Sequence, residues 1–268
     1  MTIESGRFLT GRSALITGST AGIGLDTAHV LAAMGADIMI NGFGDADHIA
    51  ALCGSLAERH GVRAAHNGAD VSKPDEVNAL VAAAIRHGGG KLDILVNNAG
   101  FSVEMPIESI EREIWDRQLA HNLSSAFHAV QSVLPTMRAN NWGRIVNVAS
   151  VMGLVGLKNR AGYVVTKHGL VGLTKVVALE TADTPITCNA VCPGIVATQR
   201  VVDMHRQKAR EAGIPLEELL RDVMTFRQPS GNYIASADVA GAIGFLCGPY
   251  ASEIRGIALN LDGGWVAR

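Results

Sequence analysis

Short runs of β-branched and aliphatic residues alternate with longer helical patterns from one end of the chain to the other. Seven of these runs have the character of strands: Ser13–Thr17, Asp37–Asn41, Arg63–His66, Leu92–Asn97, Arg144–Ala149, Thr187–Val191 and Ile257–Leu261. Such alternation is typical of βαβ units, in which right-handed crossovers place helices on both faces of a parallel sheet. The sequence therefore predicts an α/β fold built on a doubly wound, parallel, seven-stranded sheet.

The helical patterns between these strands include five stretches: about Ala21 to Met34, Pro74 to about Arg86, about Ile114 to Arg138, Tyr163 to about Glu180, and Ala237 to about Leu246. One segment, from about 198 to 232, breaks the rhythm because its helical pattern is polar. Its spaced apolar residues are Met204, Leu216, Leu219, Leu220 and Met224. Insertions longer than an ordinary connection often cover active sites, so we expect a helical substrate lid here, with a structural decoration as the alternative. No repeat or linker divides the chain, which predicts one domain over residues 1–268.

Composition narrows the class of partner. The chain is 48% hydrophobic and 18% charged, with a formal net charge of −2, so it can bury a large core. No cluster of Lys and Arg predicts contact with nucleic acid or with a membrane surface, and a small-molecule partner is favoured. The four cysteines are scattered and complete no metal set. Without a signal peptide or a membrane-spanning apolar run, a cytoplasmic location is expected.

The first predicted strand runs directly into a glycine-rich turn, Thr17-Gly18-Ser19-Thr20-Ala21-Gly22-Ile23-Gly24, and then into an apolar helix. Glycine suits positions where φ is positive or where the backbone approaches a ligand closely. The turn also directs the N–H groups of a helix N-terminus at whatever lies above, which favours a pyrophosphate. Strand, turn and helix in this order predict a dinucleotide site, with a purely structural turn as the alternative.

The end of the second predicted strand bears on which dinucleotide binds. It reads Asn41-Gly42-Phe43-Gly44-Asp45. The 2′-phosphate of NADP needs a nearby Arg or Lys, whereas the free ribose of NAD needs an acceptor. No Lys or Arg occurs between Gly18 and Arg59, so NAD is predicted over NADP, although the usual acidic residue at the strand end is missing and Asp45 comes late.

Ser150, Tyr163 and Lys167 form the candidate catalytic set. Tyr163 and Lys167 lie four residues apart and so on one helix face. Oxidation of a secondary alcohol needs a base for the hydroxyl proton while a hydride leaves, and a tyrosine with a pKa near 10 is a poor one. A neighbouring ammonium and the positive nicotinamide ring favour the phenolate and are expected to lower that pKa. Ser150 can hold the substrate oxygen. The alternative is a surface Tyr and Lys beside an ordinary loop Ser.

Together these motifs resemble the short-chain dehydrogenase/reductase family over residues 10 to 268. The resemblance implies a Rossmann-type sheet of order 3-2-1-4-5-6-7, so that the chain forms a single dinucleotide-binding and catalytic domain. It also implies that Asn122, in the long central helix, completes the catalytic set by holding water that links Lys167 to solvent; a satisfied core amide is the alternative. The implied cofactor contacts are Gly18, Thr20, Gly22, Ile23, Gly24, Phe43, Asp70, Val71, Asn97, Ala99, Gly100, Tyr163, Lys167, Pro193, Gly194, Val196 and Thr198.

Within that family the chain is similar to bacterial D-3-hydroxybutyrate dehydrogenases, through the strand end NGFGD, the stretch Val177–Ala182 and the C-terminal Asp262-Gly263-Gly264-Trp265. The implied substrate contacts are Ser102, Ser150, Met152, Arg160, Tyr163 and Met204. Where those enzymes carry Gln, His, Lys and Gln, this chain has Ser102, Met152, Arg160 and Met204. Arg160 keeps a cation that suits a carboxylate, and the methionines make the pocket more apolar.

We therefore expect an NAD-dependent oxidoreductase acting on a 3-hydroxy acid of the 3-hydroxybutyrate type. A bulkier or uncharged secondary alcohol or ketone is the alternative substrate. A non-catalytic NAD(H)-sensing protein is a more remote alternative, because such a protein is expected to have lost part of the catalytic set. The long helix and the helix from Tyr163 carry more apolar positions than one sheet face needs, and the resemblance implies that they pair into a homotetramer.

Overall fold

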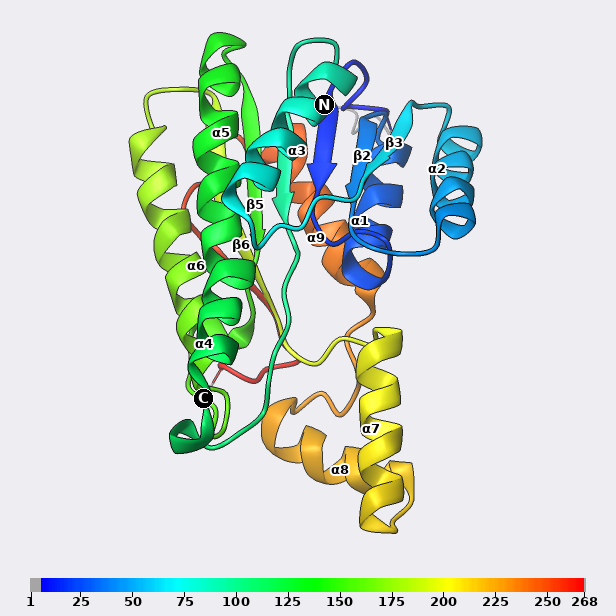
Figure 1. The fold of residues 1–268 in the computed structure, drawn as a ribbon, viewed down its shortest axis with the longest axis vertical. Coiled ribbons are helices and arrows are strands. Elements are labelled where there is room, and N and C mark those ends of the chain that lie inside the picture. The colour runs from blue at the N-terminus through cyan, green and yellow to red at the C-terminus, as the bar shows by residue number, and fades with distance from the viewer. Residues whose placement is uncertain (1–5, 268) are drawn as a thin grey trace.

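The computed structural model describes residues 6–267. Its strands form one parallel sheet in the order β3-β2-β1-β4-β5-β6-β7, as predicted (Figure 1). The strand bounds are β1 Ser13–Ile16, β2 Asp37–Asn41, β3 Ala64–Asn67, β4 Ile94–Asn97, β5 Gly143–Val148, β6 Ile186–Pro193 and β7 Ala258–Leu261. Ala14 of β1 lies opposite Ile38 on one side and Ile94 on the other. The strands after β1 are therefore added first on one side of it (β2 and β3) and then on the other (β4 to β7). A ligand crevice is expected at the carboxyl ends of the strands beside this switch point.

Helices cover both faces of the sheet (Figure 1). On one face lie α1 (Gly22–Ala33), α2 (Ala46–His60) and α9 (Ser236–Cys247). Their buried side chains pack with Ala14 and Ile16 of β1. On the other face, α3 (Pro74–His87), α5 (Ser125–Ala139) and α6 (Ala161–Glu180) pack with Leu15 of the same strand. Alternate residues of one strand thus serve two cores, and this explains why Ala14, Leu15 and Ile16 are all apolar.

The long helix expected from about Ile114 to Arg138 contains a change of helix type. It begins as α4 (Arg112–Leu119), passes through a π-helical turn (Ala120–Ser124) and continues as α5. Asn122 lies in that turn and is 1% exposed. Single π-helical turns are frequent at functional sites, because the wider turn displaces a side chain and its carbonyl from their α-helical positions. The hydrophobic period gave no sign of it.

The segment that breaks the alternation forms two helices, α7 (Gln199–Ala212) and α8 (Leu216–Arg227). They extend beyond the end of the sheet toward which the strand arrows point (Figure 1). The Thr198 hydroxyl caps α7 by accepting from Val201 N, and Gly213, with φ of 66°, ends it. Met224 of α8 is buried. Across residues 6–267, no helix is long and apolar enough to cross a lipid bilayer.

Candidate active site

The glycine-rich turn after β1 needs glycine for two different reasons. Gly18 and Gly22 have φ values of 61° and 55°, a region that favours residues without a side chain. Gly24 has an ordinary φ, but a Cβ there would lie 2.6 Å from Nδ2 of Asn98. The first turn of α1 has no side-chain cap and no acidic residue. Its N–H groups are therefore available to an anion.

Side chains from neighbouring strand ends hold this turn in place. The Thr17 hydroxyl accepts hydrogen bonds from Asn98 N (3.0 Å) and Ala99 N (3.1 Å). In return, Asn98 Nδ2 donates to the carbonyls of Thr17 (2.9 Å) and Gly18 (2.8 Å). Thr17 and Asn98 were not among the predicted site residues, and their pairing across 81 positions leaves no periodic signal in the sequence. Asn97 of the same segment points into the sheet, where Nδ2 donates to Asn147 Oδ1 (2.8 Å).

The side chains at the end of β2 are either engaged by the protein or uncharged. Asn41 is buried, and its Nδ2 donates to the carbonyls of Asn67 and Ala69, both at 3.0 Å. Asp45 caps α2, accepting from the N–H groups of Asp47 and His48. Its carboxylate therefore has a structural role at the helix start. Phe43 is 67% exposed beside the turn and carries no charge.

Asp70 and Val71 follow β3 at the same sheet edge. Val71 is buried, and Asp70 accepts hydrogen bonds from the hydroxyl and the N–H of Ser72. These hydrogen bonds hold the pKa of the Asp70 carboxyl below its usual value. Asp70 is thus a fixed negative acceptor at this edge.

Ser150, Tyr163 and Lys167 are brought together where β5 ends and α6 begins. The Lys167 ammonium lies 5.5 Å from the centre of the Tyr163 ring and donates to the Val148 carbonyl at 2.7 Å. The Ser150 hydroxyl accepts from Met152 N at 3.2 Å and donates to the Pro193 carbonyl at 3.4 Å, and its polarity lowers the pKa of Tyr163. A surface Tyr and Lys beside a loop Ser is therefore not what the structure shows.

Burial changes the acidity of both groups. It lowers the pKa of Lys167 to about 8. It also raises the pKa of Tyr163, and this outweighs the opposite effects of the Ser150 hydroxyl and of the charges on Arg160 and Arg200. The expectation that a neighbouring ammonium lowers the pKa of Tyr163 is therefore wrong for the protein groups alone. The buried Lys167 ammonium faces a backbone carbonyl, and desolvation of the phenol dominates.

The Asn122 side chain is fully engaged in the core. Its Oδ1 accepts from Phe101 N (3.0 Å), and its Nδ2 donates to Phe101 O (2.8 Å) and to the Thr166 hydroxyl (3.3 Å). A Cβ on Gly100 would lie 3.3 Å from Asn122 Oδ1 and 3.6 Å from Lys167 Nζ. The Gly100 backbone thus passes close to both residues, and Asn122 holds the chain after β4 against α6.

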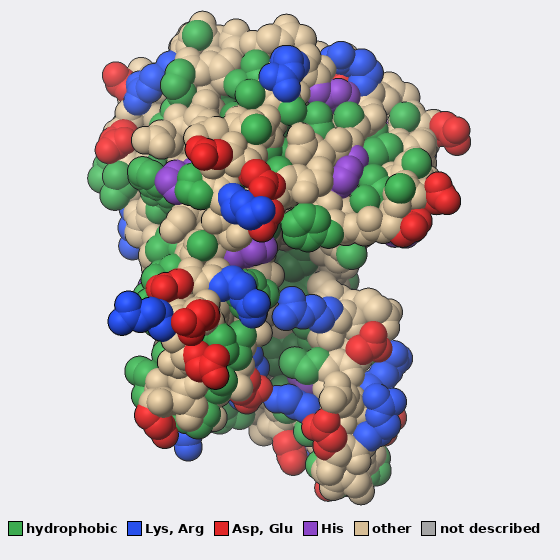
Figure 2. Space-filling model, viewed as in Figure 1, with side chains coloured by type: hydrophobic (Ala, Val, Ile, Leu, Met, Phe, Trp, Pro, Cys, Tyr) green, Lys and Arg blue, Asp and Glu red, His purple; other side chains and the backbone are tan. Residues whose placement is uncertain are grey.

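A hollow separates the α4 end of the molecule from α7 and α8, with Lys and Arg side chains on its rim (Figure 2). Ser102 and Arg160 meet, since Arg160 Nη1 donates to the Ser102 hydroxyl at 2.8 Å. Arg160 Nη2 also pairs with Glu104 at 2.8 Å. The guanidinium that was expected to reach over the substrate is therefore already engaged by two protein groups. Met152 and Met204 are half-buried.

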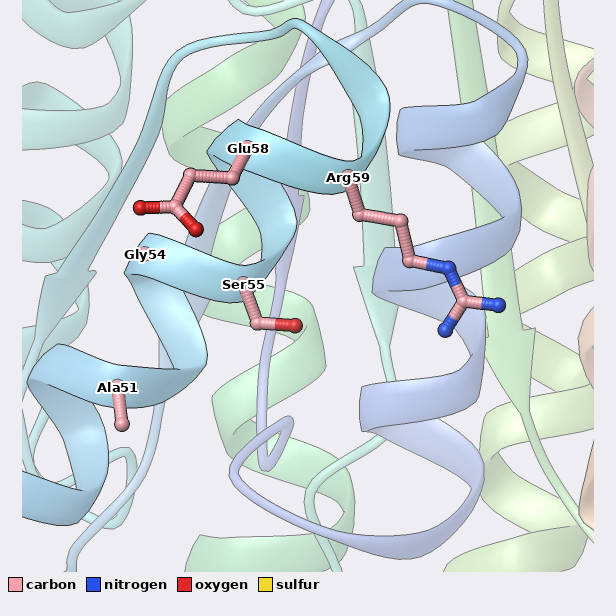
Figure 3. A pocket seen from close by; sticks show the side chains of 5 residues that line it. All are labelled: Ala51, Gly54, Ser55, Glu58 and Arg59. Atoms are coloured by element: carbon pink, nitrogen blue, oxygen red, sulfur yellow. The ribbon is translucent and has the colours of Figure 1, made fainter.

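A second hollow lies elsewhere, on the outer side of α2 (Figure 3). Ala51, Gly54, Ser55, Glu58 and Arg59 line it. One helix supplies all five residues, and the side chains of Glu58 and Arg59 point away from one another (Figure 3). None of the motif residues contributes, so this hollow is not the candidate site. Within residues 6–267, no cluster of three or more His, Cys, Asp or Glu could hold a metal ion.

Comparison with known proteins agrees with this geometry. A chain of 46% identity, matched over 97% of this chain and 100% of its own length, is D-beta-hydroxybutyrate dehydrogenase from Cupriavidus necator. The enzyme of the same name from Rhizobium meliloti is 42% identical, over 96% of this chain and 99% of its own. Among solved structures, L-sorbose reductase from Gluconobacter frateurii, complexed with NADPH and L-sorbose, matches with a TM-score of 0.92 and 30% identity. That match covers 99% of this chain and 100% of the other.

A variant of actinorhodin polyketide ketoreductase with NADPH matches with a TM-score of 0.87 and 35% identity, over 95% of this chain and 97% of its own. The family model for short chain dehydrogenase matches residues 12–209, which contain the glycine-rich turn, Ser150, Tyr163 and Lys167. The chain therefore belongs to the short-chain dehydrogenase family of oxidoreductases.

Proposed function

We propose that this chain transfers a hydride between NAD(H) and a 3-hydroxy acid of the 3-hydroxybutyrate type. The observation that carries the proposal is the convergence of Ser150, Tyr163 and Lys167 at the sheet edge that also holds the glycine-rich turn. The names of the two bacterial relatives support the substrate class. Arg160 and Lys208 both contact Glu104, so this cluster carries more positive than negative charge, which suits an acid.

The residues present fit a dinucleotide. Side chains at the three glycines of the turn would collide or be strained, and the uncapped start of α1 suits a pyrophosphate. The contacts proposed are those that the family resemblance implied, from Gly18 to Thr198. When bound, the dinucleotide supplies the nicotinamide that accepts or donates the hydride.

Side chains of this protein bind the substrate oxygen and accept its hydroxyl proton. In the oxidation direction, Ser150 holds the substrate oxygen by its hydroxyl, and the Tyr163 phenolate takes the hydroxyl proton. Lys167 is the neighbouring cation, and a positive nicotinamide ring would oppose the effect of burial on the phenol. Because the Asn122 side chain is engaged by Phe101 and Thr166, we assign the link between Lys167 and water to its backbone carbonyl in the π-helical turn.

We propose NAD rather than NADP as the cofactor. Asn41 is buried, Asp45 caps a helix and Phe43 is uncharged, so the end of β2 offers no cation to a 2′-phosphate. Catalytic efficiency with each cofactor tests this proposal, and an efficiency with NADP equal to that with NAD would contradict it.

Replacement of Tyr163 by Phe tests the chemistry. Reduction of NAD is followed by absorbance with D-3-hydroxybutyrate and with neutral secondary alcohols. Loss of the acid–base group is expected to lower kcat by about 10²–10⁴-fold. The control is Tyr250→Phe, because Tyr250 is 51% exposed on another part of the surface. A Tyr163→Phe enzyme that is as active as wild type would contradict the catalytic role, and the NAD(H)-sensing alternative would then lead.

A second substrate class has its own support. Met152 and Met204, which are half-buried, stand where the family resemblance implies polar substrate contacts, so a bulkier or uncharged alcohol is the alternative. Wild-type turnover of neutral alcohols without turnover of 3-hydroxy acids would favour it.

We further propose that the chain forms a homotetramer in the cytoplasm. Apolar side chains are exposed on α5 and α6: Phe127 (46%), Val165 (46%), Val176 (51%) and Leu179 (78%). Such an apolar face on adjacent helices suits a two-fold interface between copies. The four cysteines are free thiols, as a reducing compartment requires. Light scattering that finds a stable, active monomer would contradict the assembly.

A further inference from the structure

The segment Pro193–Val196, where β6 ends, lies against the candidate catalytic serine. Its first carbonyl, that of Pro193, accepts a hydrogen bond from the Ser150 hydroxyl at 3.4 Å. The next residue is closely packed, because a Cβ on Gly194 would lie 3.2 Å from the Cα of Asp262 in the chain after β7. The backbone of this segment therefore lies between Ser150 and the C-terminal turn, and its position bears directly on the reaction centre.

The side chain of Gln228 holds this segment in place. Gln228 is 0% exposed. Its Oε1 accepts from Ile195 N at 2.7 Å, and its Nε2 donates to the carbonyls of Ile195 (3.4 Å) and Asn232. One amide side chain thus satisfies both backbone groups of Ile195, as a neighbouring strand would. The contact is also close, since a Cβ on Gly194 would lie 2.6 Å from Gln228 Oε1.

The backbone of Gln228 is part of the end of α8. This helix ends at Arg227, and Gln228 caps it by donating its N–H to the Met224 carbonyl at 2.7 Å. The same residue therefore closes α8 with its backbone and holds the end of β6 with its side chain. Two hydrogen-bonded contacts thus connect the Ser150 hydroxyl with α8: the one at the Pro193 carbonyl and the one at the Gln228 amide.

The contacts of the Gln228 amide are specific to an amide group. It faces one N–H and two carbonyls, so it needs an acceptor on one side and a donor on the other. Two charged residues are its neighbours: Arg227 precedes it in the chain, and Asp262 belongs to the turn that packs on its Cγ. The Asp262 carboxylate is engaged, because it accepts from two backbone N–H groups of that turn. An ionised carboxylate at position 228 would instead direct an acceptor at the carbonyls of Ile195 and Asn232.

We propose that Gln228 is a positioning residue for hydride transfer: by holding Ile195 it fixes the segment Pro193–Val196 against Ser150 and couples that segment to the end of α8. This inference rests on the proposed function, since it adds a residue to the same site. Misplacement of reacting groups by about 1 Å can lower a rate by about 10²-fold. Loss of the Gln228 contacts is therefore expected to lower kcat, whereas the KM of the substrate should change little.

Gln228→Met removes the hydrogen bonds while keeping a side chain of similar length. The kcat for oxidation of D-3-hydroxybutyrate by NAD is measured per NADH-binding site, with the sites counted by fluorescence titration, so that unfolded protein does not enter the result. It is expected to fall by about 10²-fold. The matched control is Gln207→Met, because Gln207 is an exposed glutamine of α7 that donates to Glu211. This control should keep the kcat of wild type.

Gln228→Glu gives a pH-dependent test. Burial raises the pKa of a carboxyl group at this position. The protonated acid can accept from Ile195 N and donate to a carbonyl, as the amide does, whereas the ionised acid repels both carbonyls. The ratio of the variant's kcat to that of wild type is therefore expected to fall by about tenfold between about pH 6 and about pH 9. Gln207→Glu, at the exposed position, should give a ratio that does not vary with pH.

The outcomes separate this inference from the proposed function. A Gln228→Met enzyme with the wild-type kcat per NADH-binding site would overturn the inference and leave the proposed function standing. If Gln228→Met binds no NADH, Gln228→Glu decides, and a ratio that does not vary with pH would overturn the inference. Wild-type turnover of 2-butanol without turnover of D-3-hydroxybutyrate would contradict the acid substrate, and the same comparisons with 2-butanol would then support or overturn the role of Gln228.

Discussion

The glycine-rich turn and the α7–α8 helices lie close together, since Thr198 before α7 packs near Gly22, and they are held in different ways. The turn is held by backbone contacts and by the buried hydrogen bonds of Thr17 and Asn98. Among the described residues, one ion pair links α7 to the chain after β4, Lys208–Glu104, whose side chains are 43% and 39% exposed. Close packing tolerates little change, whereas exposed ion pairs contribute little free energy and can be exchanged. The glycine-rich turn is therefore expected to tolerate substitution less well than the link between α7 and the chain after β4.

Lys167, on α6 beside Tyr163, gives the largest expected effect. Its pKa in the folded protein, about 8, is below the ordinary 10.5 of an unfolded chain. Below pH 8 the ammonium is present in both states, and its burial costs stability. Between about pH 8 and 10.5 the unfolded chain binds the extra proton, so stability rises with pH. The free energy of unfolding of wild type relative to Lys167→Met is expected to rise by about 3 kcal/mol over this window.

Urea unfolding at pH values from 7 to 10 measures that change. Lys175→Met is the control, because Lys175 is an exposed lysine of the same helix. A stability difference between wild type and Lys167→Met that does not vary with pH would show that Lys167 is not desolvated.

Gly24→Ala tests the rigidity of the turn. The added methyl group would meet the Gly18 carbonyl, the Asn98 amide and the Ser19 backbone, two of which cannot move without the turn. Overpacking of this kind is expected to lower the free energy of unfolding by about 1–3 kcal/mol and to weaken NAD binding with it. Thermal unfolding and NAD titration measure the two effects. Gly54→Ala on α2, with nothing within 4 Å of the new Cβ, should be neutral; a neutral Gly24→Ala would mean that the turn is not close-packed.

Phe43→Arg tests how strongly the preference for NAD over NADP depends on one exposed position beside the turn. A guanidinium there could meet a 2′-phosphate, because Phe43 is 67% exposed at the end of β2. We expect catalytic efficiency with NADP to rise by about tenfold, or ~1.4 kcal/mol, relative to NAD. Phe43→Gln separates charge from loss of the ring. The same gain in both variants would remove charge as the reason.

Lys208→Met gives the smallest expected effect. The ion pair with Glu104 is partly exposed, so its loss should change the free energy of unfolding by less than about 1 kcal/mol. Hydrogen exchange of the α7 amides should nevertheless become faster, because one tie of α7 to the chain after β4 is gone. A loss of stability as large as that in Gly24→Ala would contradict the proposal that the turn is more closely packed than the contacts of α7.

The parts of the fold that follow from local rules were predictable. The bounds of the predicted strands and helices agree with the structure to within two residues, because a strand buried on both faces is a short continuous apolar run and a helix is a longer segment between such runs. The helix α2 (Ala46–His60) was not among those predicted. The turn from Gly18 to Gly24 was predictable because positive φ and close approach select glycine directly. The spacing of Tyr163 and Lys167 placed them on one helix face for a similarly local reason.

The sequence by itself thus determined the fold class, the sheet order through family resemblance, the glycine-rich turn after β1 and the placement of Tyr163 and Lys167 on one helix face. Only the tertiary structure decided how the side chains around them are engaged. Arg160 pairs with Glu104 across 56 positions, Thr17 holds Asn98 across 81, and burial reverses the expected direction of the Tyr163 pKa. These properties depend on which distant segments meet and on how much water they exclude. Periodicity along the chain carries no record of either, because long-range contacts and desolvation exist only once the chain has folded.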